Sequence, residues 1–338
     1  MIDQRIYYLK TLSNARFHFG EVSNDSSLSS TSAYPHSDTL WGAILHNAFL
    51  LNEDKANVLL EEMESGKVAI SSAFFFIENE NSEKLTFLPK PVIYDTYLIE
   101  NPKIDPKKIK QVEMISKGVW ESGLSPESWF DSNHCGSLQN GKFIYLKQEG
   151  EFDENLSVYK KEVTPKVPLS YLGNEETEED KRSIYYQSDV FLIPNDGFST
   201  GYYFLLKNNL DEELFEFLNE SIQLITNFGI GGDRSTGAGQ ITQIENDFFE
   251  WGFDSDVFSN LSLLIPSDDE VYRNGYYKTK TRGGQALGGD ERLDYIHCLD
   301  EGGVFKNKLK GKVVSIGQEK VKVGISYFAP FNSQNINL

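Results

Sequence analysis

Five glycines and a run of three hydrogen-bond donors, Arg234, Ser235 and Thr236, lie within one short segment, FGIGGDRSTGAGQ, at residues 228–240. Glycine tolerates a positive φ and lets backbone N–H groups approach a phosphate closely. The side chains between the glycines add one guanidinium and two hydroxyl donors. The residues concerned are Gly229, Gly231, Gly232, Arg234, Ser235, Thr236, Gly237 and Gly239. This combination suits binding of an RNA backbone through its phosphates.

Two nucleotide-binding motifs are excluded for this glycine-rich loop. Gly232 and Gly237 have the spacing of a phosphate-binding loop, but Ala238 stands where that motif needs lysine. Arg234 stands where the dinucleotide-binding fingerprint needs its third glycine. The segment also follows an expected helix and enters an expected strand, which is the reverse of the order that both motifs need. A glycine-rich connector without a ligand remains the alternative.

A second candidate site is the basic and aromatic run YRNGYYKTKTR at residues 272–282. Cations neutralise phosphates while aromatic rings stack on bases, as in many proteins that bind single-stranded RNA. The cations are Arg273, Lys278, Lys280 and Arg282. The alternative is an edge strand that its lysines protect against aggregation.

Few residues are candidates for catalysis or metal binding. Metal-independent RNA cleavage needs a general base and a general acid, for which His18, His36 and His46 are candidates. Asp38 could assist a metal ion, but as an acid in the first turn of an expected helix it needs no such role. The two cysteines, Cys135 and Cys298, and the scattered histidines do not make a four-ligand zinc site. We therefore expect no catalytic residue, no metal and no cofactor.

Charge is distributed unevenly along the chain, whose formal net charge is −19. Residues 171–270 hold 4 basic and 21 acidic side chains, whereas residues 271–322 hold 11 basic and 6 acidic ones. Residues 84–117 are also basic, with 7 basic and 4 acidic side chains. A basic groove for RNA is therefore compatible with the acidic sum, and the acidic stretch is either a solvated surface or a face for a protein partner.

The elements that position these residues alternate between strands and helices. We expect a strand at 4–12, a helix that Ser37 caps, a second helix at 55–67, and a hairpin of 68–77 with 85–94. Residues 103–124 predict a loop and then a helix. Strands at 184–193 and 201–207 precede a helix with a capping box of Asn209 and Glu212, and its apolar stripe consists of Leu214, Leu218, Ile222 and Ile225. A strand at 240–244 and a β-rich tail follow.

This order predicts an α+β protein with two ferredoxin-like (βαββαβ) domains and insertions. We expect an N-terminal domain at 1–180 with an insertion at about 125–180, and a C-terminal domain at 181–338 that carries the glycine-rich loop. No stretch approaches the roughly 20 apolar residues that span a membrane, and residues 1–10 lack the pattern of a secretory signal. The sequence therefore predicts a cytoplasmic protein.

Several segments, taken in order, make the sequence recognisable. They are HSDTLWGAI (36–44), SSAFFFI (71–77), LPKPVIY (88–94), ISKGVW (115–120), IYYQSDVFLI (184–193), GYYFLL (201–206), the GIGGDRSTGAGQ loop and EGGVFKNKLKGKVVSI (301–316). The loop resembles the signature loop of RAMP proteins, the RNA-binding subunits of CRISPR systems. The whole succession resembles the subunit of type III-A (Csm) effector complexes that caps the 5′ handle of the crRNA.

The resemblance implies the RAMP fold of two ferredoxin-like domains and a non-catalytic scaffold that takes part in antiviral defence. Its expected partners are the crRNA 5′ handle, the large polymerase-like subunit and the backbone RAMP subunit, with no membrane. The glycine-rich loop would contact the handle. Asp233 and Gln240 stand where family loops often carry basic residues, so further phosphate contacts are expected from the run at 273–282 and from Lys107, Lys108, Lys110 and Lys117.

Two other functions remain as alternatives. Some relatives of RAMP proteins cut precursor crRNA, so a metal-independent endoribonuclease is one. A module that only assembles proteins is the other, and the acidic stretch supports it.

Overall fold

A computed structural model of the chain describes residues 3–22, 29–96, 105–166, 184–285, 292–317 and 320–332. Residues 167–180 of the expected insertion, and Lys103 in the lysine-rich segment, lie outside the described residues. None of the helices in the described ranges is long and apolar enough to cross a membrane.

The elements fall into three stretches of the chain. The first holds β1 (Asp3–Lys10), β2 (Arg16–Phe17), α1 (Ser37–Leu51), α2 (Glu53–Ser65), β3 (Val68–Ile70), β4 (Phe74–Asn79) and β5 (Lys84–Pro89). The second holds α3 (Ile93–Thr96), α4 (Pro106–Gln111), β6 (Met114–Ser116), α5 (Lys117–Ser122), β7 (Cys135–Leu138), β8 (Phe143–Leu146), β9 (Tyr159–Lys166) and β10 (Tyr185–Leu192). The third holds β11 (Phe198–Asn208), α6 (Glu212–Gln223), α7 (Ile225–Phe228), β12 (Gln243–Phe248), β13 (Phe258–Asn260), β14 (Thr279–Gln285), β15 (Arg292–Leu299), β16 (Val304–Phe305), β17 (Gly311–Ser315), β18 (Val321–Ile325) and β19 (Phe328–Pro330).

One large sheet organises the molecule, and its strand order is β12-β1-β11-β4-β5-β6-β8-β7, with β3 also paired to β11. All neighbouring pairs are antiparallel except β6 and β8. The expected hairpin forms between β4 and β5, where Phe76 faces Thr86. The apolar run before it is divided into β3 and β4, and both parts pair with β11.

The first ferredoxin-like unit is assembled from segments that come before and after the expected insertion in the sequence. Strand β1, helices α1 and α2, strands β3/β4, strand β11, helix α6 and strand β12 follow the βαββαβ order and form neighbouring strands of the large sheet. Tyr7 of β1 faces Phe204 of β11. The boundary expected at 180/181 therefore runs through this unit, and the glycine-rich loop connects α6 to β12 inside it.

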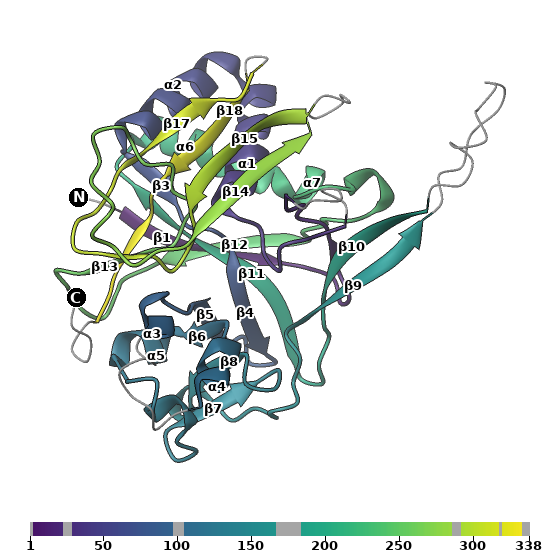
Figure 1. Ribbon diagram of the computed structural model, residues 1–338. Coiled ribbons are helices and arrows are strands. Elements are labelled where there is room, and N and C mark those ends of the chain that lie inside the picture. Colours follow the sequence, from purple (N-terminus) through teal and green to yellow (C-terminus); the bar gives the residue numbers. More distant parts are fainter. Residues whose placement is uncertain are drawn as a thin grey trace.

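Helices α1 and α6 cover the sheet with the apolar faces that their sequences predict. Leu40, Trp41, Ile44, Leu45 and Ala48 of α1 are all buried. The stripe on α6 is buried too, although its last member, Ile225, opens α7. Figure 1 shows these helices with α2 on one side of the strands.

The N-terminal caps of α1 and α6 differ from those predicted from the sequence. Ser37 is the first residue of α1 and not its cap, and its hydroxyl accepts from the N–H of Leu263. Asp211, not Asn209, caps α6 by accepting from the N–H of Leu214 at 2.9 Å. A cap needs only a suitable oxygen near the first turn, so adjacent polar residues compete for the position.

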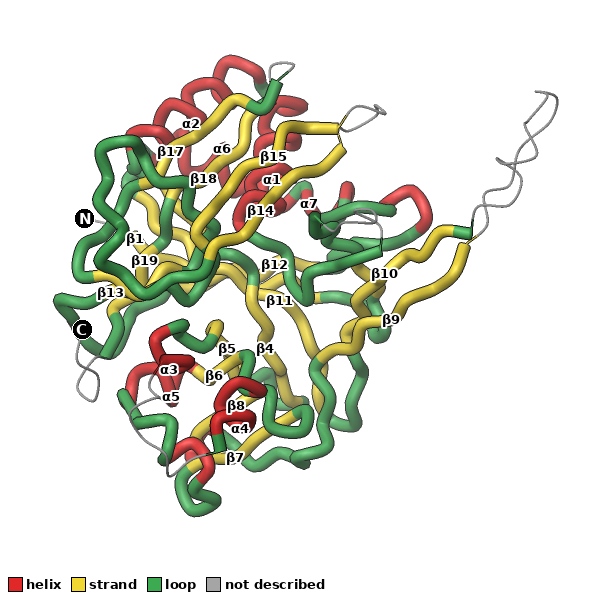
Figure 2. Tube along the Cα trace, viewed as in Figure 1, coloured by secondary structure: helices red, strands yellow, loops and turns green. Residues whose placement is uncertain are grey.

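The C-terminal stretch from Phe258 onward contains only strands among its described residues. They form the sheet β16-β13-β19 and the hairpins β14-β15 and β17-β18, and β18 packs beside α1. A second βαββαβ sheet is not traced in this described stretch, so the second ferredoxin-like domain stays a prediction. Figure 2 shows the two hairpins lying next to the helices of the first unit.

A smaller sheet, β2-β10-β9, leads away from the body of the protein. Strands β9 and β10 pair along their whole length, from Tyr159 opposite Leu192 to Lys166 opposite Tyr185. They form the arm that projects to one side in Figure 1. The arm begins where β2 and the glycine-rich loop meet.

Candidate nucleic-acid interface

The glycine-rich loop packs against β2 and the residue that follows it. The N–H of Gly239 donates to the carbonyl of Arg16 at 2.7 Å, and the N–H of Gly232 donates to the carbonyl of His18 at 2.9 Å. The N–H of Ile230 donates to the carbonyl of Gly239 at 2.9 Å and closes the base of the loop. On its other side, β2 pairs with β10. The loop and the arm are therefore held by the same short strand.

Three of the five glycines are required by this close packing. A Cβ on Gly231 would lie 2.6 Å from the carbonyl oxygen of His18, and one on Gly229 would lie 2.7 Å from the carbonyl oxygen of Gly239. Gly239 has φ +77°, and a Cβ there would collide with the backbone of Ile230. Gly237, with φ +87°, faces open space and serves the turn. The expected function of these glycines as a phosphate cradle is thus reduced to the tip of the loop.

The tip of the loop offers unused backbone donors. Asp233 is left-handed, with φ 60°, and a single 3-10 turn of Arg234–Thr236 follows it. Within the described part of the chain, the N–H groups of Gly231, Asp233, Arg234 and Ser235 make no hydrogen bond. The Arg234 guanidinium folds back to donate to the carbonyl of Phe228 at 3.2 Å. Such clustered N–H groups suit an anion.

Two cations that the sequence analysis missed stand beside this tip. The Arg16 guanidinium donates to the Thr236 hydroxyl at 2.6 Å and to Asp189 at 3.3 Å. Lys166, at the end of β9, lies 3.8 Å from Asp233. Burial alone would raise the pKa of Asp233, but the Gln187 amide and the charges of Lys166 and Arg16 hold it below its usual value. Asp233 therefore stays ionised and reduces the positive charge at the loop, as its position in the sequence suggested.

The arm exposes large side chains along its two strands. Val163 is 59% exposed, Ile184 59%, Tyr185 37% and Tyr186 55%. Lys160 lies over the ring of Phe191 at 5.4 Å. Exposed tyrosines next to cations can stack on bases, so the arm extends the donor-rich tip into one continuous surface.

The basic run at 272–282 is mostly engaged within the protein. Lys278 pairs with Asp95 at 2.8 Å and Lys280 with Glu21 at 2.6 Å. Arg282 is 5% exposed and pairs with Asp38, and the rings of Tyr272 and Tyr277 pack on the core around Phe305. Arg273 is exposed, and it has no ion-pair partner among the described residues. The run enters strand β14 only at Thr279, and its ion pairs with Glu21 and Asp38 join the C-terminal part to the first unit, which favours the structural alternative.

The lysines at 107–117 lie in another part of the molecule. Lys107, Lys108 and Lys110 are exposed on α4, and Lys117 pairs with Glu121 at 2.7 Å on α5. Figure 1 shows α4 and α5 beside β6, β7 and β8, at the other end of the large sheet from β12, α7 and the loop that follows α7. The structure therefore does not bring these lysines together with the glycine-rich loop.

The three candidate catalytic histidines have separate surroundings. His18 faces the carbonyl of Ser188 at 2.8 Å, His36 lies 2.8 Å from Glu301, and His46 packs on the ring of Phe228. No hydrogen bond or ring contact joins two of these histidines in the described ranges. Burial would raise the pKa of Asp38, but Arg282 and Lys322 hold the pKa of this carboxyl far below its usual range. Its charge is already neutralised by two cations.

Comparison with known proteins agrees with this architecture. Residues 254–331 match the model of the CRISPR Csm4 C-terminal domain. The chain is 28% identical to a CRISPR system protein Csm4 of Methanocaldococcus jannaschii, over 93% of this chain and 89% of that protein. It is 24% identical to a Csm4 of Streptococcus thermophilus, over 91% of each.

Solved structures share the fold over nearly the whole chain. A chain from the crystal structure of a Csm3-Csm4 subcomplex of a type III-A CRISPR-Cas interference complex has a TM-score of 0.67 and 22% identity, with 97% of this chain and 99% of that chain covered. A chain from a Csm1-Csm4 cassette in complex with pppApA has a TM-score of 0.58 and 15% identity, with 98% of each chain covered.

The sheet of β12, β1, β11 and β4, with the glycine-rich loop leading into β12, belongs to a fold that this chain shares with the chains of solved type III-A CRISPR assemblies. The family model matched by residues 254–331 and both relatives are those of Csm4. The resemblance drawn from the sequence motifs is thus confirmed, and Csm4 of the type III-A Csm complex is the subunit that this chain resembles.

Proposed function

We propose that the chain is a non-catalytic, cytoplasmic scaffold that holds the 5′ handle of the crRNA in a type III-A complex. The observation that carries the proposal is the continuous surface of loop tip, β2 and arm. It combines backbone N–H groups that have no acceptor among the described residues, the cations Arg16 and Lys166, and exposed tyrosines on β10. These are the three kinds of group that bind phosphates and bases of single-stranded RNA.

The proposed partners follow from the solved relatives. Their crystal structures contain a Csm3-Csm4 subcomplex and a Csm1-Csm4 cassette. We extend both contacts to this chain, so that it joins the large polymerase-like subunit to the first backbone subunit. The handle would lie across the loop tip, and the arm would reach along the crRNA toward the backbone.

The proposed absence of nuclease activity rests on the histidines. Among the described residues, no hydrogen bond or ring contact joins His18, His36 or His46 to another of the three, and His36 is 1% exposed. A general base must reach the 2′-OH of the substrate at hydrogen-bond distance, which a residue so deeply buried does not do. Incubation of the purified chain with repeat RNA should yield no cleavage. Cleavage that is lost in His18→Ala would contradict the proposal.

The binding surface can be tested in the reconstituted complex with a labelled crRNA. Tyr186→Ala should weaken retention of the crRNA by about 1–3 kcal/mol if the ring stacks on a base. Lys166→Ala should weaken it uniformly across handle sequences, because phosphates carry no sequence information.

Lys107→Ala with Lys110→Ala is the matched comparison, since both lysines are exposed and lie at the other end of the large sheet. We expect crRNA retention in this double variant to equal that of the wild type. Loss of crRNA in the double variant, with no effect of the loop and arm variants, would assign the handle to α4 instead.

A further inference from the structure

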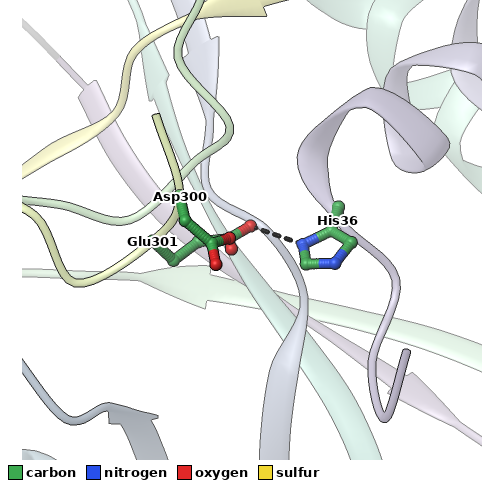
Figure 3. A group of neighbouring side chains, drawn as sticks. All are labelled: His36, Asp300 and Glu301. Atoms are coloured by element: carbon green, nitrogen blue, oxygen red, sulfur yellow. Dashed lines mark hydrogen bonds and ion pairs between the residues drawn. The ribbon is translucent and has the colours of Figure 1, made fainter. Parts of the chain in front are cut away.

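A buried histidine and two adjacent carboxylates meet between the first unit and the C-terminal strands. His36 precedes α1, and Asp300 and Glu301 follow β15. The Nδ1 atom of His36 lies 2.8 Å from Oε1 of Glu301, and one nitrogen or oxygen atom from each of the three side chains lies within 4.8 Å of the others. Figure 3 shows the imidazole directed toward the two carboxylates.

This cluster has polar atoms without partners. His36 is 1% exposed and Glu301 is 6% exposed. The Oε1 atom of Glu301 accepts from the hydroxyl of Ser72, but Oε2 of Glu301 and Oδ1 of Asp300 are buried and accept no hydrogen bond among the described residues. Buried carboxylate oxygens without donors are costly, so an unpaired pair of them indicates a missing cation or proton.

The nearby cations are engaged elsewhere. Lys280 forms its ion pair with Glu21 at 2.6 Å, and Arg282 forms its ion pair with Asp38 at 2.9 Å. In the described part of the chain, the carboxylates of Asp300 and Glu301 therefore have no direct ion pair with a lysine or an arginine, and their neighbour is the imidazole of His36.

We propose that His36, Asp300 and Glu301 form a binding site for one divalent transition-metal ion of the zinc type. Nitrogen and oxygen ligands bind Zn²⁺ at about 2.0–2.2 Å, so two ligands of one ion are at most about 4.4 Å apart. The three side chains already come close to this limit, and a small rotation of Asp300 closes the set. Ser72 or a water molecule is suitable as the fourth ligand.

The chemistry of the ligands selects the ion. An imidazole nitrogen favours Zn²⁺ over Mg²⁺, which prefers an all-oxygen shell and keeps several waters. Because His36 belongs to the first unit and the two acids belong to the C-terminal strands, the ion would fasten these parts together. The site is thus structural, and it is independent of whether the loop and arm bind RNA.

The test uses the full chain after treatment with a chelator and dialysis. After Zn²⁺ is added back and the excess is removed, we expect the chain to retain one equivalent of Zn²⁺, measured as metal content by mass spectrometry. The Tm should rise with added Zn²⁺ and saturate at one equivalent. Mg²⁺ at the same concentration should give neither. Glu301→Gln and Asp300→Asn, which keep the side-chain volume, should each weaken Zn²⁺ binding at least 10–100-fold, about the loss that even outer-shell changes cause.

Asp294→Asn is the matched control, because Asp294 is an exposed acid on β15, a few residues before the site. It should retain the ion and the Tm rise. His36→Gln tests the third ligand if one of the acid variants fails to fold.

Two results would overturn the proposal. One is equal Zn²⁺ retention in wild type and in all three site variants. The other is no retention by the wild type, which would mean that the carboxyls share a proton. Burial and the adjacent Glu301 raise the pKa of Asp300 to about 7, so that arrangement is the chemical competitor of the ion.

Discussion

Replacement of Arg282 with alanine should destabilise the fold and not remove an RNA contact. The Arg282 guanidinium donates to the two carboxylate oxygens of Asp38 at 2.9 and 3.1 Å. The two side chains are only 6% and 4% exposed. Removal of one member of a buried pair costs about 3–5 kcal/mol, because the other charge stays buried. Lys322, at 3.1 Å, remains beside Asp38, so we expect a loss of about 3 kcal/mol, at the lower end of that range.

Urea unfolding followed by tryptophan fluorescence measures this loss as a fall in the midpoint at constant slope. Arg273→Ala is the control, since Arg273 is exposed, and its effect should stay within about 0.5 kcal/mol. Adding Asp38→Asn to Arg282→Ala should recover part of the loss, because it removes the uncompensated charge. If Arg282→Ala were as stable as Arg273→Ala and yet bound crRNA poorly, the structural assignment of Arg282 would be refuted.

Three other predictions follow from the geometry. Gly239→Ala should destabilise the chain by about 1–3 kcal/mol in the same unfolding assay, because φ is +77° and the Cβ meets backbone, whereas Gly42→Ala on the open surface of α1 should not destabilise it. Burial acts to raise the pKa of Asp95, but the ion pairs with Lys278 and Lys90 lower it below its usual value. The ionised Asp95 carboxylate should therefore contribute its full share to the free energy of unfolding above about pH 4, and this share should be lost as the pH falls through the pKa of the folded state. The stability difference between wild type and Asp95→Asn, measured by unfolding at several pH values, should therefore shrink in acid. With Arg16, Lys166 and Arg234 as the cations described at the loop, log K for handle RNA in the complex should fall with log salt at a slope of about −2, and a slope several times steeper would point to another surface.

Periodicity predicted the buried faces of the helices well. The stripe from Leu40 to Ala48 and the stripe on α6 are buried, because an apolar face repeats with the helix whatever it packs against. The caps were less predictable. Asn209 and Asp211 both offer an oxygen near the first turn of α6, and only the path of the chain before the helix decides between them.

The domain boundary was not readable from the sequence, because strand pairing is a long-range property. Tyr7 faces Phe204 across nearly two hundred residues, and β11 returns to the sheet only after the insertion and the arm. An order of strands and helices gives the number of units but not which strands share a sheet. The glycine-rich loop was therefore found by composition and assigned to the wrong side of a boundary.

Ion pairing is also a long-range property that the sequence does not reveal. A run of lysines and arginines is visible in the sequence, whereas the acids that neutralise it are distant, as with Glu21 for Lys280 and Asp38 for Arg282. Conversely, Arg16 stands alone in its segment, and Lys166 belongs to a short lysine-containing strand, YKKEVTPK, inside the stretch expected to be an insertion. Charge density along the chain thus overstated the run at 272–282 and missed the loop.

The negative net charge of the chain limits how RNA can be held. At the loop, Arg16 pairs with Asp189, and Asp233 lies next to both Arg16 and Lys166. Little net positive charge therefore remains there. Long-range attraction of RNA to a chain of net charge −19 is then weak, and affinity must come from positioned N–H groups and stacking rings. Such contacts act only when the RNA is already aligned with them. We therefore expect handle binding to depend on assembly with the other subunits, which bring the crRNA to the loop, and to be weak in the isolated chain.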